Sequence, residues 1–334
     1  MLRIVVNHPA SISCRKGAGS RVVFLRLILV LLLVVAGAVL AQRFGGRRGY
    51  GGGGDSGIVF TEGRVAVDCD KVRTAREIAA HSTEPANWTN SPGFEKDVFT
   101  FVRVLYRSGP NRSSGGTWVT DFPDSDLNLS FRLQQVTSLK TNPDGRVLRL
   151  VDPALFDYPW IYMVEPGGLE FKDEEVPILR KYLLNGGVLW ADDFWGRLQW
   201  DNFEREIKRV FPERGFVELD MTNQIFHCVF DLKVPKNKLQ TPNYRQGIWS
   251  LDPNSWQYGK TYEDYHDYDP EAAKDMHVRA IFDDKGRIMV IATHNCDNGD
   301  GWEREGAHDG FFHEFSEKRA YPLAVNVIFY LMTH

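Results

Sequence analysis

The sequence feature that most constrains the fold is a stretch at residues 182–193, which reads Tyr-Leu-Leu-Asn-Gly-Gly-Val-Leu-Trp-Ala-Asp-Asp. The two glycines are typical of a helix end, and the short apolar run after them predicts a strand that is covered on both faces. The carboxyl ends of such strands form the ligand-binding edge of open α/β sheets. We therefore expect the two aspartates that close the run, Asp192 and Asp193, to lie at a ligand site.

Strand and helix patterns alternate along most of the remaining chain. The following ranges are expected to be strands: 98–106, 146–151, 160–164, 188–192, 216–219, 225–230, 277–282 and 287–293. The following are expected to be helical: 127–136, 173–184, 200–211 and 318–332. The alternation predicts an α/β fold with a mostly parallel sheet and helices on both faces. The turn at 283–286 predicts a C-terminal hairpin.

The N-terminal region is set apart by its composition. Residues 1–41 contain basic residues but no acidic ones and end in a long apolar run, which indicates a cleaved signal peptide or, with residues 22–41 as the span, a membrane anchor. Residues 42–57 are a glycine-rich linker. Residues 58–95 form a lead-in with an expected strand at 58–67 and helix at 71–81, and residues 96–334 form the α/β domain. We expect an exported, periplasmic or extracytoplasmic protein, either soluble after cleavage or anchored.

The charge of the exported part argues against one class of partner. Five of the 40 basic residues lie within residues 1–41, which leaves 35 against 44 acidic residues. A surface with this excess of acids does not suit nucleic acid. The cysteines left after cleavage, Cys69, Cys228 and Cys296, are an odd number set far apart. This is no disulfide framework, although one pair could form in an oxidising compartment.

Four blocks in order carry a resemblance to a known family. They lie at residues 99–106, 118–126, 158–163 and 186–193. Together they resemble the bacterial family called domain of unknown function 4159, from about residue 97 to the C-terminus. The resemblance implies an α/β domain similar to the class I glutamine-amidotransferase-like, or flavodoxin-like, folds.

Catalytic members of that superfamily carry a cysteine on a Gly-x-Cys-x-Gly turn with a histidine as its base, because the attacking group is a thiolate. This chain departs from that pattern. Cys69 precedes the domain, Cys228 falls in an expected strand, and Cys296 lies between Asn295 and Asp297. We therefore do not expect amidotransferase chemistry.

Acidic residues at two neighbouring strand ends are the candidate catalytic groups. Asp192 and Asp193 close one strand, and Glu165 ends its expected neighbour. Together they could bind a cation, a sugar hydroxyl or a proton. In the alternative interpretation, which we slightly favour, the two aspartates cap the next helix and pair with Arg197.

The segment 118–126 offers further ligand-binding candidates. Asp121 and Asp124 could reach the same crevice, with Arg103 and Arg132 as partners that would neutralise them. One aspartate of this segment is expected to be a helix N-cap. We favour structural pairing of Asp121 with an arginine.

The glycine-rich segment 294–303 has oxygen-bearing side chains that hint at a calcium loop. His294 and Asn295 are ligand-binding candidates, but the spacing of the oxygen-bearing residues is not that of an EF-hand, which favours a turn without metal. The histidines at 294, 308 and 313 do not have zinc-ligand spacing. We assign no metal site and no cofactor.

An aromatic insertion at residues 233–270 is too long for a plain connection and predicts a lid or an interaction surface. Its Trp256 and Tyr258 are candidates for stacking on carbohydrate. The equally favoured alternative is that its aromatic residues pack the insertion onto the domain.

Two hypotheses for the function follow. The first is a non-catalytic module of the cell envelope that binds an envelope protein or a carbohydrate, attached to the membrane if the N-terminal segment is uncleaved. The second is a carboxylate-dependent hydrolase of a glycan or related polymer, with or without a divalent cation. Convergence of Asp192, Asp193, Glu165 and His294 in one cleft would favour the second, and pairing of these side chains with arginines and backbone would oppose it.

Overall fold

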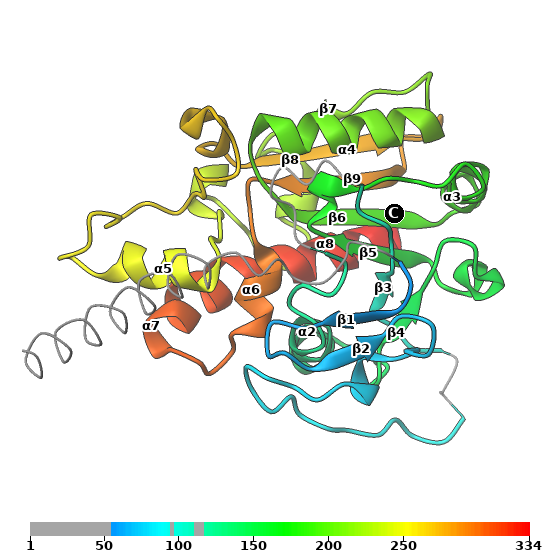
Figure 1. The fold of residues 1–334 in the computed structure, drawn as a ribbon, viewed down its shortest axis with the longest axis horizontal. Helices are drawn as coiled ribbons and strands as arrows, with labels where there is room; N and C mark the ends of the chain where they lie inside the picture. Colours follow the sequence, from blue (N-terminus) through cyan, green and yellow to red (C-terminus); the bar gives the residue numbers. More distant parts are fainter. Residues whose placement is uncertain (1–54, 94–96, 110–116) are drawn as a thin grey trace, which may run out of the picture. The chain divides into compact units, whose positions relative to one another are not determined.

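The centre of the molecule is a seven-stranded sheet (Figure 1). In a computed structural model, which describes residues 55–93, 97–109 and 117–334, the strand order is β4-β3-β5-β6-β9-β8-β7. The strands span β4 (Arg146–Leu148), β3 (Val102–Val104), β5 (Trp160–Val164), β6 (Val188–Phe194), β9 (Ile288–His294), β8 (His277–Phe282) and β7 (Val217–Glu218). The first five are parallel, and β8 is antiparallel to both of its neighbours. The prediction of an α/β fold with a mostly parallel sheet and a C-terminal hairpin is confirmed.

The five parallel strands follow a doubly wound order. Taken along the chain, they lie in the order second, first, third, fourth, fifth, so the direction of winding reverses between β3 and β5. Open sheets of this kind bind ligands outside the carboxyl ends of the strands, at the point of reversal. The topology therefore points to the ends of β3, β5 and β6.

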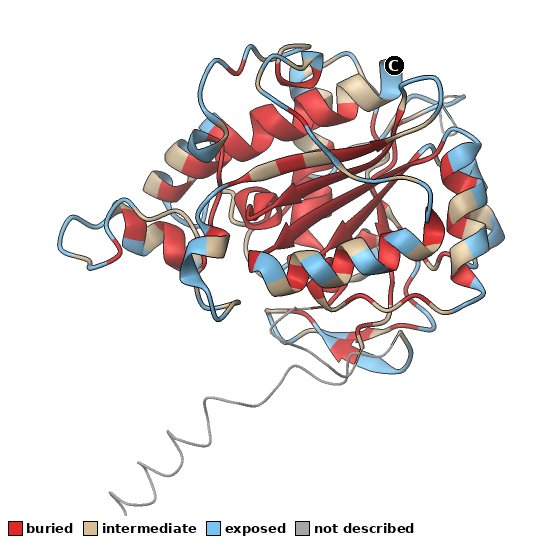
Figure 2. Cartoon of the chain, turned by 90° about the horizontal axis from the view of Figure 1, so that it is seen from above, coloured by how far each residue is buried: buried red, intermediate tan, exposed pale blue. Residues whose placement is uncertain are grey.

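Helices cover both faces of the sheet. One face packs against α3 (Glu175–Leu184) and α4 (Gly196–Val210), through Leu179, Leu183 and Phe203. The other packs against α2 (Asp124–Val136), α6 (Asn298–Glu303) and α8 (Tyr321–Thr333). Figure 2 shows the strands buried between these layers. Every residue of β5, β6 and β9 is buried, as expected of strands covered on both sides.

An aromatic cluster holds α6 against the sheet. Because side chains alternate along a strand, Trp160 and Tyr162 of β5 share a face with Trp190 of β6. The ring of Trp302 in α6 packs on this face, 5.6 Å from Trp190 and 5.8 Å from Tyr162 between centroids. Such ring pairs contribute about 0.5–1.5 kcal/mol each beyond the area they bury. The cluster fixes α6, and with it the acidic residues around its start.

The lead-in differs from its prediction. The expected strand at 58–67 is a hairpin of two strands, β1 (Ile58–Phe60) and β2 (Ala66–Asp68). The expected helix at 71–81 is wrong, because only a 3-10 turn forms, at Ala75–Glu77. Backbone groups nearby bond across to the domain instead: the amide of Val147 in β4 donates to the carbonyl of Arg73, 2.8 Å away. The lead-in thus covers the outer edge of β4.

A second prediction fails near residue 228. Residues 225–230 are not a strand but contain a 3-10 turn at Gln224–Phe226. The amides of Val229 and Phe230 donate to the side-chain oxygen of Asn326 in α8, at 3.1 and 2.7 Å, and so cannot join a sheet ladder. Cys228 therefore does not lie in a strand.

Other expected elements keep their type but change their limits. The strand expected at 98–106 is only three residues long in β3, and that expected at 216–219 is two residues in β7. The helix expected at 318–332 begins as α8 at Tyr321, after a π-helix at Phe312–Ala320. The insertion contains α5 (Tyr244–Leu251) and 3-10 turns at Lys236–Lys238 and Pro270–Ala273, and α7 (Asp309–Phe311) follows α6.

All described residues belong to one compact unit. The expected signal peptide or anchor at 1–41, and the linker up to residue 54, lie outside the described residues. Within the described ranges, no helix combines the length and the apolar character needed to cross a membrane.

Candidate functional site

Residues with left-handed backbone lie at the ends of β5, β6 and β9 and in the connection that follows β3. Asp121 lies in the connection after β3, Glu165 directly follows β5, Asp193 lies near the end of β6, and Asn295 directly follows β9; their φ angles are 60°, 47°, 57° and 59°. Non-glycine residues seldom adopt this conformation, and such residues cluster at functional sites. Among the described residues the other non-glycine example is Arg64, in the turn between β1 and β2. Residues with left-handed backbone therefore cluster at the carboxyl edge of the sheet, where the topology predicts a ligand site.

A pocket of about 260 Å³ opens at this edge. Its acidic lining residues are Glu62, Asp121, Glu165, Asp193, Glu263, Asp297 and Asp300. Its basic lining residues are Arg245, His266 and Arg304, and its other lining residues are Thr120, Asn243, Tyr244 and Tyr265. We call this cavity the acid pocket. Two of the three catalytic candidates, Asp193 and Glu165, line it, and so does the ligand-binding candidate Asp121.

Three aspartates lie together in the acid pocket. Asp121, Asp193 and Asp297 each offer a carboxylate oxygen within 4.8 Å of the others. Burial raises the pKa of all three well above the usual range, and neighbouring carboxylates raise it further. Asp297 also caps α6, where its Oδ1 accepts a hydrogen bond from the amide of Asp300 at 2.7 Å.

Glu165 stands beside this trio with its own partner. Its Oε2 accepts a hydrogen bond from the hydroxyl of Thr120 at 2.6 Å. Burial raises the pKa of Glu165 to about 8, against the opposing effects of Thr120 and His266. Near neutral pH the side chain therefore carries a proton that it can donate.

Asp192 is not part of the acid pocket, although it adjoins Asp193. Strand alternation turns it to the opposite face, where it accepts hydrogen bonds from the hydroxyl of Tyr162 at 2.9 Å and from the side-chain and backbone nitrogens of Asn298 at 2.8 and 3.1 Å. The hydroxyl of Thr293 is a further donor. Burial raises its pKa to about 6, although these donors favour the charged form. Asp192 ties β5, β6, β9 and α6 together.

The helix-cap interpretation of the aspartate pair is wrong. The N-cap of α4 is Trp195, whose side chain makes no capping hydrogen bond, and the first-turn amides of Arg197 and Leu198 donate to Asp267 of the insertion. Arg197 contacts Asp201 instead, at 3.5 Å. The indole nitrogen of Trp195 does donate to Oδ1 of Asp193, at 2.9 Å, which orients that carboxylate.

The expected pairing of Asp121 with an arginine is also wrong. Arg103 is fully buried and forms its ion pair with Asp126, while it donates to the carbonyl of Thr120 at 2.9 Å. Arg132 pairs with Glu305. Arg103 therefore holds the connection that carries Asp121, without neutralising Asp121. The N-cap expected among these aspartates is not found either, since Pro123 precedes α2 without a side-chain cap.

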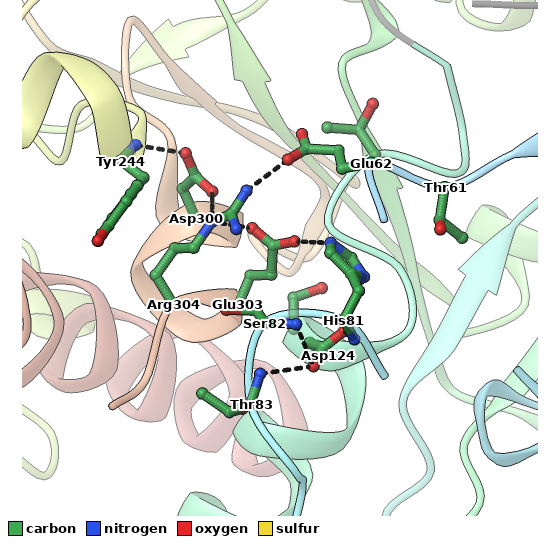
Figure 3. A network of polar contacts seen from close by, with 12 residues as sticks. Thr61, Glu62, His81, Ser82, Thr83, Asp124, Tyr244, Asp300, Glu303 and Arg304 are labelled. Atoms are coloured by element: carbon green, nitrogen blue, oxygen red, sulfur yellow. Dashed lines mark hydrogen bonds and ion pairs between the residues drawn. The ribbon is translucent and has the colours of Figure 1, made fainter. Parts of the chain in front are cut away.

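A network of ion pairs joins the lead-in to the acid pocket (Figure 3). Arg304 contacts Glu62 at 2.5 Å, Asp300 at 3.3 Å and Glu303 at 2.6 Å. Burial alone would lower the pKa of Arg304, but these carboxylates outweigh it and raise the pKa. His81 lies between Glu303 and Asp124, at 2.5 and 3.0 Å.

Asp124 lies in that network and does not line the pocket. It accepts hydrogen bonds from the backbone amides of His81, Ser82 and Thr83, at 3.1, 3.4 and 3.2 Å. It thereby fastens the lead-in to the start of α2.

His294 and Asn295 support the site from outside it. One ring nitrogen of His294 lies 2.8 Å from the carbonyl of Gly196, and burial lowers its pKa to about 3. Asn295 accepts from the amide of Gly196 and donates to the carbonyls of Ala272 and Asp275. Both side chains hold the end of β9 to the start of α4.

Trp256 and Tyr258 lie on the exposed part of the insertion. Their exposed fractions are 86% and 62%, and neither lines the acid pocket. Tyr265 of the same insertion does line it, and its hydroxyl donates to Glu263. The insertion therefore contributes one wall of the pocket, through residues 243–245 and 263–266.

The thiols of the three cysteines in the described ranges take no part in the acid pocket. Burial raises the pKa of the thiols of Cys69, Cys228 and Cys296. All three are free thiols, and none lines the acid pocket. A buried thiol with a raised pKa is a poor nucleophile.

Comparison with known proteins decides the family. A family model described as a domain of unknown function, DUF4159, matches residues 100–332. The chain belongs to this family. No curated protein matches the chain.

The family region does not contain the whole site. Glu62 and His81 precede residue 100, so the lead-in supplies one pocket wall and one member of the ion-pair network. Glu62, Glu263 and Asp300 were not among the sequence candidates. They lie in loops and in α6, where no local pattern marks an acid as part of a site. Asp297 had a signal, because it lies shortly after the end of β9, in the glycine-rich segment 294–303 whose oxygen-bearing residues hint at a calcium loop.

Proposed function

We propose that this protein is an exported binding module of the cell envelope whose acid pocket takes a hydroxyl-rich ligand of the carbohydrate class. The observation that carries the proposal is the convergence of acids on one pocket at the reversal point of the sheet, from the ends of β5 and β6 and from the connections that follow β3 and β9. Sites at this edge are the usual ligand sites of doubly wound sheets.

The lining of the pocket supports a ligand with many hydroxyl groups. Sugar hydroxyls donate hydrogen bonds to carboxylates, and Asn243 and Arg245 can donate in return. The half-exposed ring of Tyr265 provides an apolar surface beside them. Small-molecule sites usually combine a few polar groups with such rings.

Two further parts of the proposal rest on the sequence. The basic and apolar character of residues 1–41 supports export, with residues 22–41 as the anchor if the segment is not cleaved. The strand order and the sequence blocks support a relation to the glutamine-amidotransferase-like superfamily. The buried thiols oppose amidotransferase chemistry.

A second candidate function is glycan hydrolysis, and Glu165 is the observation that favours it. A carboxyl with a pKa of about 8 can act as a general acid at neutral pH, and Asp193 lies in the same pocket. Asp192 and His294 do not enter the pocket, so the hydrolase in this form depends on Glu165 and on the aspartate trio.

Ligand-detected NMR on the full-length protein tests the binding proposal. Saturation transfer to N-acetylglucosamine, N-acetylmuramic acid, glucose and short cell-wall glycans is measured with and without added calcium. We expect transfer to at least one sugar, with loss in Asp193→Asn and retention in the control variant Asp201→Asn, at an exposed position of α4. An absence of transfer to every sugar in the wild-type protein, or equal transfer in both variants, contradicts the proposal.

The same samples separate binding from hydrolysis. Chromatography of the glycans after incubation detects any shortened products. If the protein is a hydrolase, Glu165→Gln abolishes product release while saturation transfer persists, because the amide cannot donate a proton to a leaving group. Binding without product in the wild-type protein supports the binding module.

A further inference from the structure

The aspartate trio of the acid pocket is buried and has no basic partner. The exposed fractions of Asp121, Asp193 and Asp297 are 1%, 5% and 2%. Within the described ranges, no lysine, arginine or histidine forms an ion pair with any of the three. Buried carboxylates of this kind must either hold protons or meet a cation, because an uncompensated buried charge costs several kcal/mol.

One oxygen of the trio is left without any hydrogen-bond partner. Oδ2 of Asp121 is buried, and nothing in the described part of the chain donates to it. In contrast, Oδ1 of Asp193 accepts from Trp195, and Oδ1 of Asp297 accepts from the amide of Asp300. Each of these two aspartates is thus oriented through one oxygen. Buried acceptors without a partner are rare in proteins, and a bound cation would give this carboxylate oxygen a partner.

A glycine makes room for the orphaned oxygen. A Cβ atom at Gly299 would lie 2.0 Å from Oδ2 of Asp121. The first turn of α6 can therefore approach Asp121 only because residue 299 has no side chain. The same turn carries Asp297, so the glycine brings two members of the trio together.

The acidic residues next to the trio are already paired with basic side chains. Asp121, Asp300 and Glu303 also approach one another within 4.8 Å, but Arg304 pairs with Asp300 and Glu303, and His81 contacts Glu303. The protein supplies the positive charge on that side. Among the residues that the structure describes, no basic side chain forms an ion pair with Asp193 or Asp297, so the charge deficit is local to the trio.

We propose that Asp121, Asp193 and Asp297 hold one hard divalent cation of the calcium, magnesium or manganese class. Three carboxylate oxygens from three connections, with no sulfur or imidazole ligand, suit these ions and not zinc or copper. The remaining coordination positions face the pocket, where ligand hydroxyls bind to the ion. The inference deepens the proposed function and rests on it for this last step, and it replaces the sequence expectation of no metal site.

The test uses the full-length protein after treatment with EDTA and dialysis. Calorimetric titrations with calcium, magnesium and manganese chloride extend to about 10 mM, because extracellular calcium sites bind at about 0.1–1 mM. We expect one ion per chain and a rise in melting temperature with ion concentration. Manganese paramagnetic resonance counts the bound ion without relying on stability.

Matched variants separate a metal ligand from a structural acid. Asp121→Asn, Asp193→Asn and Asp297→Asn are expected to weaken ion binding by about tenfold or more. Asp201→Asn, at an exposed position of α4, keeps the wild-type affinity. Gly299→Ala weakens binding without changing any charge, whereas Gly215→Ala, where a Cβ would meet nothing within 4 Å, does not.

The effect of Asp193→Asn on the melting temperature is expected to have opposite signs in EDTA and in saturating cation. In EDTA, Asp193→Asn melts at or above the wild-type temperature, because one of the mutually repelling carboxylates is gone. In saturating cation, Asp193→Asn melts at a lower temperature than the wild-type protein. A variant that merely damaged the fold would melt lower in both conditions.

Outcomes for the cation and for the ligand are distinguishable. An absence of heat, of bound manganese and of any melting shift in the wild-type protein overturns the cation site, and so does binding that all three aspartate variants retain. Sugar binding that persists in EDTA leaves the proposed function standing while the cation site fails. Cation binding without any sugar response supports the site and contradicts the proposed ligand class.

Discussion

At the scale of single residues, the acid pocket owes its properties to carboxyl groups that the fold keeps from solvent. Asp193 and Glu165 at strand ends, and Asp121 in the connection after β3, have left-handed backbone, and each has a raised pKa because of burial. Left-handed backbone is less costly for aspartate and asparagine than for most other residues. Asparagine substitutions at 121 and 193 therefore change the charge while the backbone stays in place.

The protonation of Glu165 predicts a specific dependence of stability on pH. Its pKa is about 8 in the folded protein and near 4.5 when unperturbed. Between these values the folded state holds a proton that the unfolded state has released, so stability falls as pH rises. We expect Glu165→Gln to lose less stability than wild type between pH 5 and 8, by on the order of 3 kcal/mol. Urea unfolding at several pH values, in EDTA, measures this difference.

The control for this prediction is Glu174→Gln, at an exposed position before α3. Its unfolding free energy is expected to follow the wild-type pH profile. A Glu165→Gln profile parallel to wild type over the same interval would mean that Glu165 is already ionised in the folded protein.

At the scale of elements, the parts of the site that follow strands were predictable from the sequence and the parts in loops were not. The buried run before Asp192 and Asp193 located β6, and Trp160–Val164 located β5 and hence Glu165. Side chains alternate along β6, so only one of the two aspartates can enter the pocket. Which of them does so depends on the face of the sheet that α6 covers, and the sequence does not indicate that face. Asp300 and Glu263 approach through tertiary packing alone, which leaves no periodic signal in the sequence.

Local sequence patterns also gave wrong secondary-structure predictions where the backbone groups bond to distant partners. Residues 225–230 have the apolar character of a strand, yet Asn326 takes their amides. Residues 71–81 have a helical stripe, yet their backbone bonds to the loop before β4 and to β4 itself. In both regions a distant partner outweighs the local preference.

The attachment of the lead-in to α2 and α6 predicts a stability effect at His81. Replacing His81 with leucine removes its contacts to two buried carboxylates, Asp124 and Glu303. We expect a loss of about 2–3 kcal/mol in the free energy of unfolding, since each buried acid loses a partner. Urea denaturation followed by circular dichroism gives the value.

His313→Leu is the matched control. This histidine is exposed and pairs with Glu317 one helical turn away. Its replacement is expected to change the unfolding free energy by less than about 0.5 kcal/mol. Equal losses in the two variants would show that the contacts of His81 carry no special weight.

At the scale of the whole molecule, the family region depends on the segment before it. A chain shortened to residues 100–332 lacks Glu62 and the backbone amides that bind Asp124, and it uncovers β4. We expect this chain to melt at a lower temperature, or without cooperativity, compared with residues 55–334. Thermal denaturation and binding of a hydrophobic dye compare the two. Identical cooperative melting of both chains would contradict a structural role for the lead-in.

The cover over β4 has a further consequence for the protein in a crowded compartment. Unpaired outer strands are the usual points at which sheets of different molecules join into aggregates. Here the lead-in occupies one side of the sheet, and the strand on the other side, β7, is two residues long with Glu218 held by Lys236, His277 and Arg279. Neither side offers a long free ladder, so we expect the folded protein to remain dispersed at high concentration, and detachment of the lead-in to begin aggregation at β4.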